Sequence, residues 1–351
     1  MLSRVADSLY WTARYIERAE NTARFIDVNL QMSLDAPITF SEQWEPLIAI
    51  TGDKEAFSRR YDKATRESVI RFLTIDRENP NSIVSAVMKA RENARSVREV
   101  ISSDVWEQIN AFYLLVSSAN AERLALNDSY NFFADIKRFS HLTAGVADNT
   151  MSHGEAWNFM QLGRMIERAD NTSRLLDVKY FLLLPSAEDV GSAIDEMQWS
   201  ILLRSATALE MYRRRHGTIT PANVIDFLLL DTEFPRAILF CLLMAEQSLH
   251  AVSGTRPGTF SNLAERRLGQ MRSELAYSQV SEIIAGGLHE FLDSFQAQLN
   301  AAGEAISATF FALQSEGLSR NNGGLSRDLL FGDQSQGWID RDRRHEGDLR
   351  Q

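Results

Sequence analysis

The chain has 351 residues, of which 44% are hydrophobic and 24% are charged, and its formal net charge is −10. A chain of this size can bury a large core, and its negative charge argues against a nucleic-acid partner held through phosphate contacts. The single cysteine, Cys241, excludes a disulfide framework, and its apolar neighbours predict a buried, inert thiol.

The beginning of the chain, MLSRVADSLYW, lacks the uninterrupted apolar region of a signal peptide. The longest apolar runs are much shorter than a membrane span. We therefore expect a cytoplasmic protein that has no membrane partner.

The first thirty residues have the apolar spacing of one amphipathic helix. At 100° per residue, the apolar side chains fall in one arc: Val5, Leu9, Ile16, Ala19, Ala23, Ile26 and Leu30. Arg14, Glu17, Asn21 and Arg24 form a polar stripe on the other side. The mixed charges and bordering aromatic residues of this stripe suggest that a second helix layer covers it.

The polar stripe belongs to a segment that occurs twice. RYIERAENTARFIDV (14–28) and RMIERADNTSRLLDV (164–178) share ten of fifteen residues, where ordinary composition would give about one. Seven of the ten identities are polar, while several apolar positions differ. Because a solvated face tolerates almost any polar residue, this retained polar identity indicates specific hydrogen bonding or a binding site.

The duplication continues at a spacing of 155 residues, where 43–83 matches 198–238 with fifteen of forty-one residues identical. The chain therefore contains two copies of one unit, at about 1–150 and 151–313, within one helical domain of residues 1–313. Strand and hairpin patterns are absent, so the sequence predicts an all-α fold with about six helices per half. Two such halves usually pack about a pseudo-twofold axis.

Two shared identities in these copies predict local structure. Thr65 and Thr220 are expected to be helix N-caps. Pro80 and Pro235 are expected to be prolines in the first turn of a helix. Both expectations assign these identities to structure rather than to function.

The last residues, 314–351, are rich in glycine, arginine and aspartate and have little apolar content. This composition predicts a disordered tail. The alternative is a docking segment that uses Leu329, Leu330 and Phe331.

If the polar side chains of the two motif copies pair with one another, their helices pack side by side, with Glu17 near Arg168 or Glu167 near Arg18. A buried ion-pair network of this kind would retain residue identity without any chemistry. The alternative is a polar pocket that binds a substrate. The candidate residues for either role, including two matched arginine pairs, are Glu17, Arg18, Asn21, Arg24, Arg59, Arg60, Glu167, Arg168, Asn171, Arg174, Arg214 and Arg215.

Arginine pairs suit carboxylate or phosphate groups. Arg59-Arg60 and Arg214-Arg215 are either solvated surface residues or part of a pocket for a charged group. A peptide carboxylate, an acidic amino acid or an acyl phosphate would each fit such a pocket.

The sequence offers no recognisable catalytic set and predicts no metal site and no cofactor. None of the six histidines stands three residues after a glutamate, as carboxylate-bridged metal sites in helical bundles require. Glu246 and His250 are one helical turn apart but have no second such pair beside them. Gly286-Gly287 and Gly323-Gly324 lack the pattern of a phosphate-binding loop.

Several segments together resemble the bacterial alpha-E family, an all-helical family with a Glu-Arg motif. They are Met1–Ala6, Ile16–Thr22, Ala90–Arg95 and Ile166–Thr172. The resemblance covers about residues 1–313. The family's motif falls on Glu17-Arg18 and Glu167-Arg168, and less closely on Arg91, Glu92, Asn93 and Arg95. The family supplies no known chemistry for these residues.

The resemblance implies partners. Members of this family are typically encoded beside, or fused to, a circularly permuted ATP-grasp ligase, and often near a transglutaminase-like cysteine peptidase. We therefore expect an accessory or co-catalytic partner of an ATP-grasp amide or peptide ligase, which binds the ligase or a charged peptide-like substrate. The alternative is a stand-alone enzyme that modifies an amino acid or a peptide in a polar helical pocket.

Overall fold

The computed structural model describes residues 1–35, 44–182 and 193–312, and every regular element in these ranges is a helix. The chain divides into two units, Met1–Ala312 and Leu313–Gln351, and the first contains all the described helices. The predicted tail lies outside the described residues. The all-α prediction is confirmed for the described part of the chain.

The first eight helices are α1 (Ser3–Asp35), α2 (Glu45–Thr51), α3 (Lys54–Ser58), α4 (Arg66–Thr74), α5 (Ile83–Ser96), α6 (Ser103–Val116), α7 (Ala121–Asn127) and α8 (Ser129–Thr150). The next eight are α9 (Glu155–Leu182), α10 (Ala193–Ser205), α11 (Leu209–His216), α12 (Pro221–Leu230), α13 (Ile238–Ser253), α14 (Leu263–Ala276), α15 (Val280–Gly286) and α16 (Leu288–Ile306). A π-helical segment, η2 (Ser307–Phe311), follows α16.

The expectation of about six helices per half was therefore too low. The additional helices are short: α2, α7 and α15 have seven residues each, and α3 has five. Hydrophobic periodicity separates helix from loop only over windows of about 11 to 18 residues. Helices of two turns or fewer are shorter than that window.

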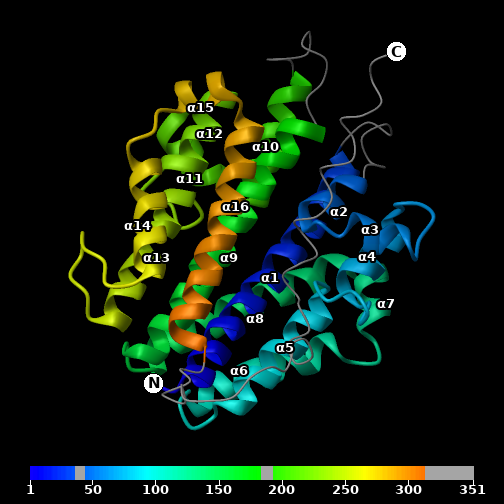
Figure 1. The fold of residues 1–351 in the computed structure, drawn as a ribbon. Helices are drawn as coiled ribbons and strands as arrows, with labels where there is room; N and C mark the ends of the chain where they lie inside the picture. The colour runs from blue at the N-terminus through cyan, green and yellow to red at the C-terminus, as the bar shows by residue number, and fades with distance from the viewer. Residues whose placement is uncertain (36–43, 183–192, 313–351) are drawn as a thin grey trace, which may run out of the picture. The chain divides into compact units, whose positions relative to one another are not determined.

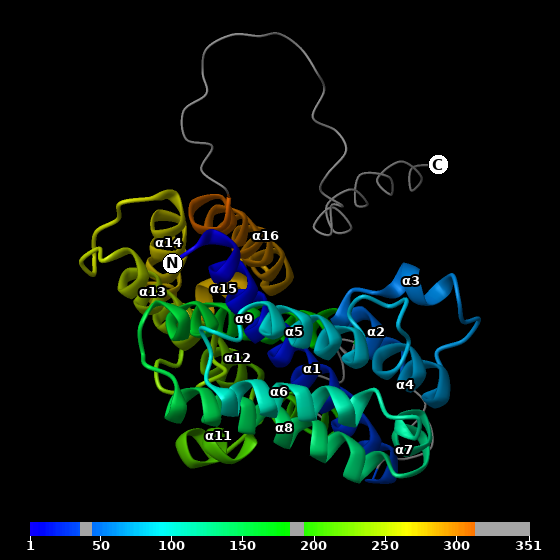
Figure 2. The same cartoon turned by 90° about the horizontal axis from the view of Figure 1, so that it is seen from below.

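The two helices that contain the repeated motif, α1 and α9, lie side by side (Figure 1). α1 also packs against α5 and α8, and α9 packs against α13 and α16. Figure 2 shows α5, α6 and α8 on one side of this pair, with α13, α14 and α16 on another. Because α1 and α9 have neighbours on several sides, their polar residues are covered as well as their apolar ones.

The predicted apolar arc of α1 faces the core. Five of its members are buried, and Val5 and Leu30 are partly buried and pack against the core. On the other side of α1, Glu17 and Asn21 are only 4% and 2% exposed. The expectation that a second helix layer covers the polar stripe is confirmed.

The two predicted caps are confirmed. The Thr65 side chain accepts a hydrogen bond from the backbone N–H of Ser68 at the start of α4. Thr220 does the same with Asn223 at the start of α12.

The interpretation of Pro80 and Pro235 as first-turn prolines was wrong. α5 begins at Ile83 and α13 begins at Ile238, so each proline lies three residues before its helix. The Ser82 N–H donates to the Asn79 carbonyl, which closes a β-turn with Pro80 at its second position. Proline favours that position because its φ is already fixed near the required value.

The close approach of α1 and α9 depends on Gly163. A Cβ atom at this position would collide with the backbone carbonyl oxygen of Tyr10 on α1. The backbone atoms of two packed helices cannot move apart easily. Because glycine has no Cβ atom, α1 and α9 approach closely enough for the charged side chains of one helix to bind those of the other.

Gly163→Ala is therefore expected to lower the free energy of unfolding by about 1 to 3 kcal/mol or more, because overpacking forces the two helices apart. Urea unfolding followed by circular dichroism measures the change. Gly145→Ala is the matched control, since nothing lies within 4 Å of a Cβ atom at that helical site. The control should be neutral or slightly stabilising. Equal midpoints for both variants would contradict the proposed role of Gly163.

Candidate functional site

The two Glu-Arg motifs bind one another across the contact between α1 and α9. Arg168 of α9 donates two hydrogen bonds to the Glu17 carboxylate, at 2.7 and 2.9 Å. Arg18 of α1 donates two to the Glu167 carboxylate, at 2.6 and 3.1 Å. The repeated motif predicted one of these contacts, and both are present.

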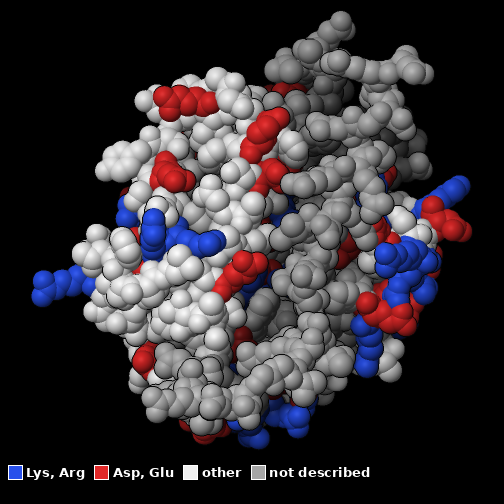
Figure 3. Space-filling view, viewed as in Figure 1, with Lys and Arg blue, Asp and Glu red and all other residues white. Residues whose placement is uncertain are grey.

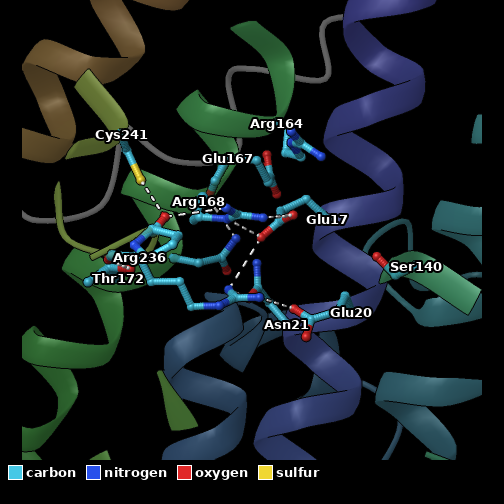
Figure 4. Close-up of polar contacts among 12 residues, drawn as sticks. Glu17, Glu20, Asn21, Ser140, Arg164, Glu167, Arg168, Thr172, Arg236 and Cys241 are labelled. Atoms are coloured by element: carbon cyan, nitrogen blue, oxygen red, sulfur yellow. Dashed lines mark hydrogen bonds and ion pairs between the residues drawn. The ribbon is translucent and has the colours of Figure 1, made fainter. Parts of the chain in front are cut away.

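Each motif glutamate also has a second arginine, and here the two copies differ. Glu167 accepts from Arg14 at 2.7 Å. Glu17 instead has Arg236, at 3.3 Å, from the turn before α13. Arg236 also donates to Glu20 at 2.6 Å and to Asn21 at 2.7 Å, so one guanidinium joins three residues of α1 (Figure 4).

The buried carboxylates remain ionised because arginines surround them. Burial by itself raises the pKa of Glu167, but Arg18 and Arg14 more than offset this effect and lower the pKa to about 2. The pKa of Glu17 is lowered in the same way, against burial, by Arg168 and Arg236. Buried ionised groups of this kind are stable only when they are paired.

The remaining stripe residues pair mostly along their own helices. Arg24 binds Glu20 one turn earlier, and Arg174 donates to Asp170 at 2.9 Å. The Asn171 side chain donates to the Glu167 carbonyl at 2.8 Å.

The matched arginine pairs do not join this network. Arg59, Arg60, Arg214 and Arg215 are exposed, and Figure 3 shows charged side chains of both signs gathered over α3 and α4. Arg60 binds Asp76 at 2.5 Å. At the equivalent positions of the second copy, Arg215 binds Asp231.

Each of these aspartates also accepts a backbone hydrogen bond in the turn that follows its helix. Asp76 accepts the N–H of Glu78 at 3.0 Å, and Asp231 accepts that of Glu233 at 2.7 Å. This structural contact explains the matched identity of Arg60 and Arg215.

The third segment of the family resemblance lies on α5, where Ala90 and Ala94 are buried and Glu92 and Arg95 are exposed. Arg91 donates to Asn110 of α6 at 2.8 Å, and its guanidinium lies 4.7 Å from the ring centroid of Tyr113. Arg95 pairs with Glu92 at 2.8 Å. These residues bind α6 and one another.

Cys241 is fully buried, as expected, and burial raises the pKa of its thiol to about 12. A thiol with this pKa is protonated at neutral pH and is a poor nucleophile. Among the described residues, no cluster of three or more His, Cys, Asp or Glu side chains is placed to hold a metal ion. No helix in the described ranges is both long enough and apolar enough to cross a bilayer.

A cavity lies beside the network, between α1, α8 and α9. Its volume is about 40 Å³. The residues that line it are Ala13, Ile16, Glu17, Ser140, Thr143, Ala144, Ala147, Asp148, Trp157, Met160, Gln161 and Arg164. Of the sequence candidates only Glu17 reaches this cavity.

Sequence reasoning missed Arg236, although a signal for it was present. The spacing of 155 places Arg236 opposite Asn81, within the second matched segment. Asn81 accepts a hydrogen bond from Arg18 at 3.1 Å, so both residues contact the network. The candidates were positions at which the two copies have the same residue. Asn81 and Arg236 were passed over because they are different residues, one uncharged and one charged.

A family model described as a predicted alpha-helical domain with a conserved ER motif, Alpha-E, matches residues 1–311. The chain therefore belongs to this family. The Glu-Arg pairs of the two repeated segments, Glu17-Arg18 and Glu167-Arg168, are the residues that bind one another between α1 and α9.

Similar curated proteins include uncharacterized protein Mb2597 of Mycobacterium bovis and uncharacterized protein Rv2567 of Mycobacterium tuberculosis. Each is 27% identical over 336 residues, a match that covers 88% of this chain. The chain spans only 37% of the length of each relative. No solved structure matches the chain.

Proposed function

We propose that this member of the Alpha-E family is an accessory or co-catalytic partner of an ATP-grasp amide or peptide ligase. In this role it holds the ligase or a charged peptide-like substrate. One observation carries the proposal: Glu17 and Glu167 are each bound by two arginines within the fold. Groups neutralised in this way are suited to fixing a scaffold rather than to acid-base chemistry on a substrate.

We further propose that the two halves are related by a pseudo-twofold axis between α1 and α9. The reciprocal bonds from Arg18 to Glu167 and from Arg168 to Glu17 support this arrangement. So does the order of the helices, because the repeat spacing sets α1 opposite α9 and α4 opposite α12. A scaffold of this kind presents two similar surfaces to its partners.

The length of the relatives supports a partner role. In the mycobacterial proteins the matched segment is only 37% of the chain, so it works there beside a larger part of the same polypeptide. We propose that an ATP-grasp ligase supplies the equivalent part for this protein and that a transglutaminase-like peptidase is a further partner. We place the protein in the cytoplasm, where ATP is available to such a ligase.

Reconstitution tests the proposal. The full chain and a circularly permuted ATP-grasp ligase from the same organism are purified separately and then combined with ATP and candidate carboxylate and amine substrates. We expect the two proteins to co-elute on size exclusion and expect ATP-dependent product formation to rise when the chain is added. An equal rate and product profile without the chain would make the accessory role wrong.

A variant separates a scaffold from an active site. Glu167→Gln keeps the shape of the side chain but removes its charge, and it is assayed at a temperature where circular dichroism shows it folded. We expect its effect on the ligase to stay within about twofold of the unaltered chain. Loss of activity in a folded Glu167→Gln protein, or turnover by the purified chain without ATP or ligase, would favour the stand-alone enzyme.

A further inference from the structure

The cavity between α1, α8 and α9 has one arginine in its wall that the buried network does not use. Arg164 donates to Gln161 at 2.5 Å, but its buried Nε has no hydrogen-bond partner among the described residues. Burial and the neighbouring Arg168 both lower the pKa of Arg164. An arginine stays charged in proteins. The charge of Arg164 is therefore balanced less well than the charges of Arg14, Arg18 and Arg168, each of which binds a glutamate carboxylate.

The difference between the two copies explains why Arg164 lacks a carboxylate. Its counterpart Arg14 is bound to Glu167. On the other side, Arg236 takes the second position on Glu17, and the residue equivalent to Arg236 is the uncharged Asn81. The second copy therefore has one more guanidinium than the first. Figure 4 draws no bond between Arg164 and Glu17.

The cavity also has an acidic group in its wall. Asp148 is exposed and accepts hydrogen bonds from Trp157 at 3.0 Å and from Gln161 at 3.3 Å. The Gln161 amide thus joins the two charges, because its oxygen accepts from Arg164 and its nitrogen donates to Asp148. The remaining wall includes alanine and methionine side chains.

We infer that this cavity binds a small α-amino acid such as glycine or alanine, with its carboxylate on Arg164 and its ammonium group toward Asp148. A guanidinium binds a carboxylate through strong charge-assisted hydrogen bonds. The inference rests on the cavity alone and holds whether or not a ligase is the partner.

The size of the cavity limits the ligand. A volume of about 40 Å³ accommodates roughly three water molecules, which is comparable to a carboxylate with its adjoining carbon. A larger side chain would have to extend out of the cavity. The preference is therefore for glycine and alanine over leucine or phenylalanine.

Binding is measured on the purified full chain by isothermal titration with glycine, L-alanine, propionate and L-leucine at constant ionic strength. Propionate has the carboxylate and carbon chain of alanine but no ammonium group. We expect alanine to bind at least about tenfold more tightly than propionate, which corresponds to one charge-assisted contact. Leucine should bind more weakly than alanine.

Three variants locate the site. Arg164→Gln should weaken alanine binding at least about tenfold, and Asp148→Asn should reduce alanine to the affinity of propionate. Ala144→Leu fills the cavity and keeps both charges, so it tests the site even if Arg164→Gln fails to fold. Arg138→Gln, on the exposed face of α8, makes the same charge change away from the cavity and should bind normally.

Alanine affinity that is unchanged in both Arg164→Gln and Ala144→Leu would overturn the site. Equal affinity for alanine and propionate would overturn the role of Asp148 and the assignment to an amino acid. Competition by chloride or phosphate as effective as that by alanine would likewise overturn the assignment.

Discussion

Glu167→Ala is expected to lower the free energy of unfolding by about 3 to 5 kcal/mol, the cost of removing one member of a buried ion pair. The Glu167 side chain is 2% exposed and joins Arg14 and Arg18. After the substitution both guanidinium groups stay largely covered without their carboxylate. Arg18 keeps its hydrogen bond to Asn81. Arg14 keeps a 3.4 Å contact with the Tyr10 hydroxyl and its place 4.8 Å from the Trp11 ring centroid, and neither neighbour carries a negative charge.

Glu17→Ala should cost less than Glu167→Ala, although it removes the same motif residue. Its loss leaves Arg168 without a carboxylate, but Arg236 remains paired with Glu20. Removing Glu17 also relieves its repulsion with Glu20, which raises the pKa of Glu17 in the intact protein. Urea unfolding of both variants at neutral pH measures which substitution lowers the free energy of unfolding more.

Glu67→Ala is the control for both variants. Glu67 pairs with Arg71 on the surface of α4, with its side chain 64% exposed. Exposed pairs of this kind contribute less than about 1 kcal/mol. If the three variants unfolded at similar urea concentrations, the buried network would not be the structural centre of the fold. Unchanged stability with lost ligase activity would instead make the motif a site.

The sequence predicted this network because two copies of one helix retained the same charges. Polar identity is informative in a buried contact, where each donor needs its own acceptor. The pairing of Glu17 with Arg168 followed from that argument. Arg60 and Arg215 were harder to place, because an identity retained for a surface contact resembles one retained for a pocket.

The cavity at Arg164 was not predictable from the repeat. Arg14 and Arg164 are identical in sequence, and comparison of the copies assigns them the same role. Their roles differ because Arg236, far along the chain, takes one of the positions on Glu17. Arg236 reaches Glu17 only when the turn before α13 packs against α1 and α9. Local sequence patterns describe the faces of α1 and α9 separately and do not show that a residue from a third segment binds Glu17.

Acid is expected to remove about 3 kcal/mol of stability through Glu167 alone. The pKa of this group is about 2 in the folded protein, against an ordinary value of 4.5, and each pKa unit corresponds to about 1.4 kcal/mol. Because the folded pKa is the lower one, this contribution is complete above about pH 5 and is lost as the pH falls toward 2. The lowered pKa values of Glu17 and Glu20 act in the same direction.

Glu167→Gln isolates this contribution, because glutamine does not titrate. At pH 7 the variant should be less stable than the unaltered chain, and the two curves of unfolding free energy against pH should converge between pH 5 and pH 2. Urea unfolding at fixed ionic strength measures both curves, with Glu67→Gln as the exposed control that keeps the full pH dependence. Parallel curves for Glu167→Gln and the unaltered chain over this range would show that Glu167 keeps an ordinary pKa. The pairing with Arg14 and Arg18 would then contribute little to the stability of the folded state.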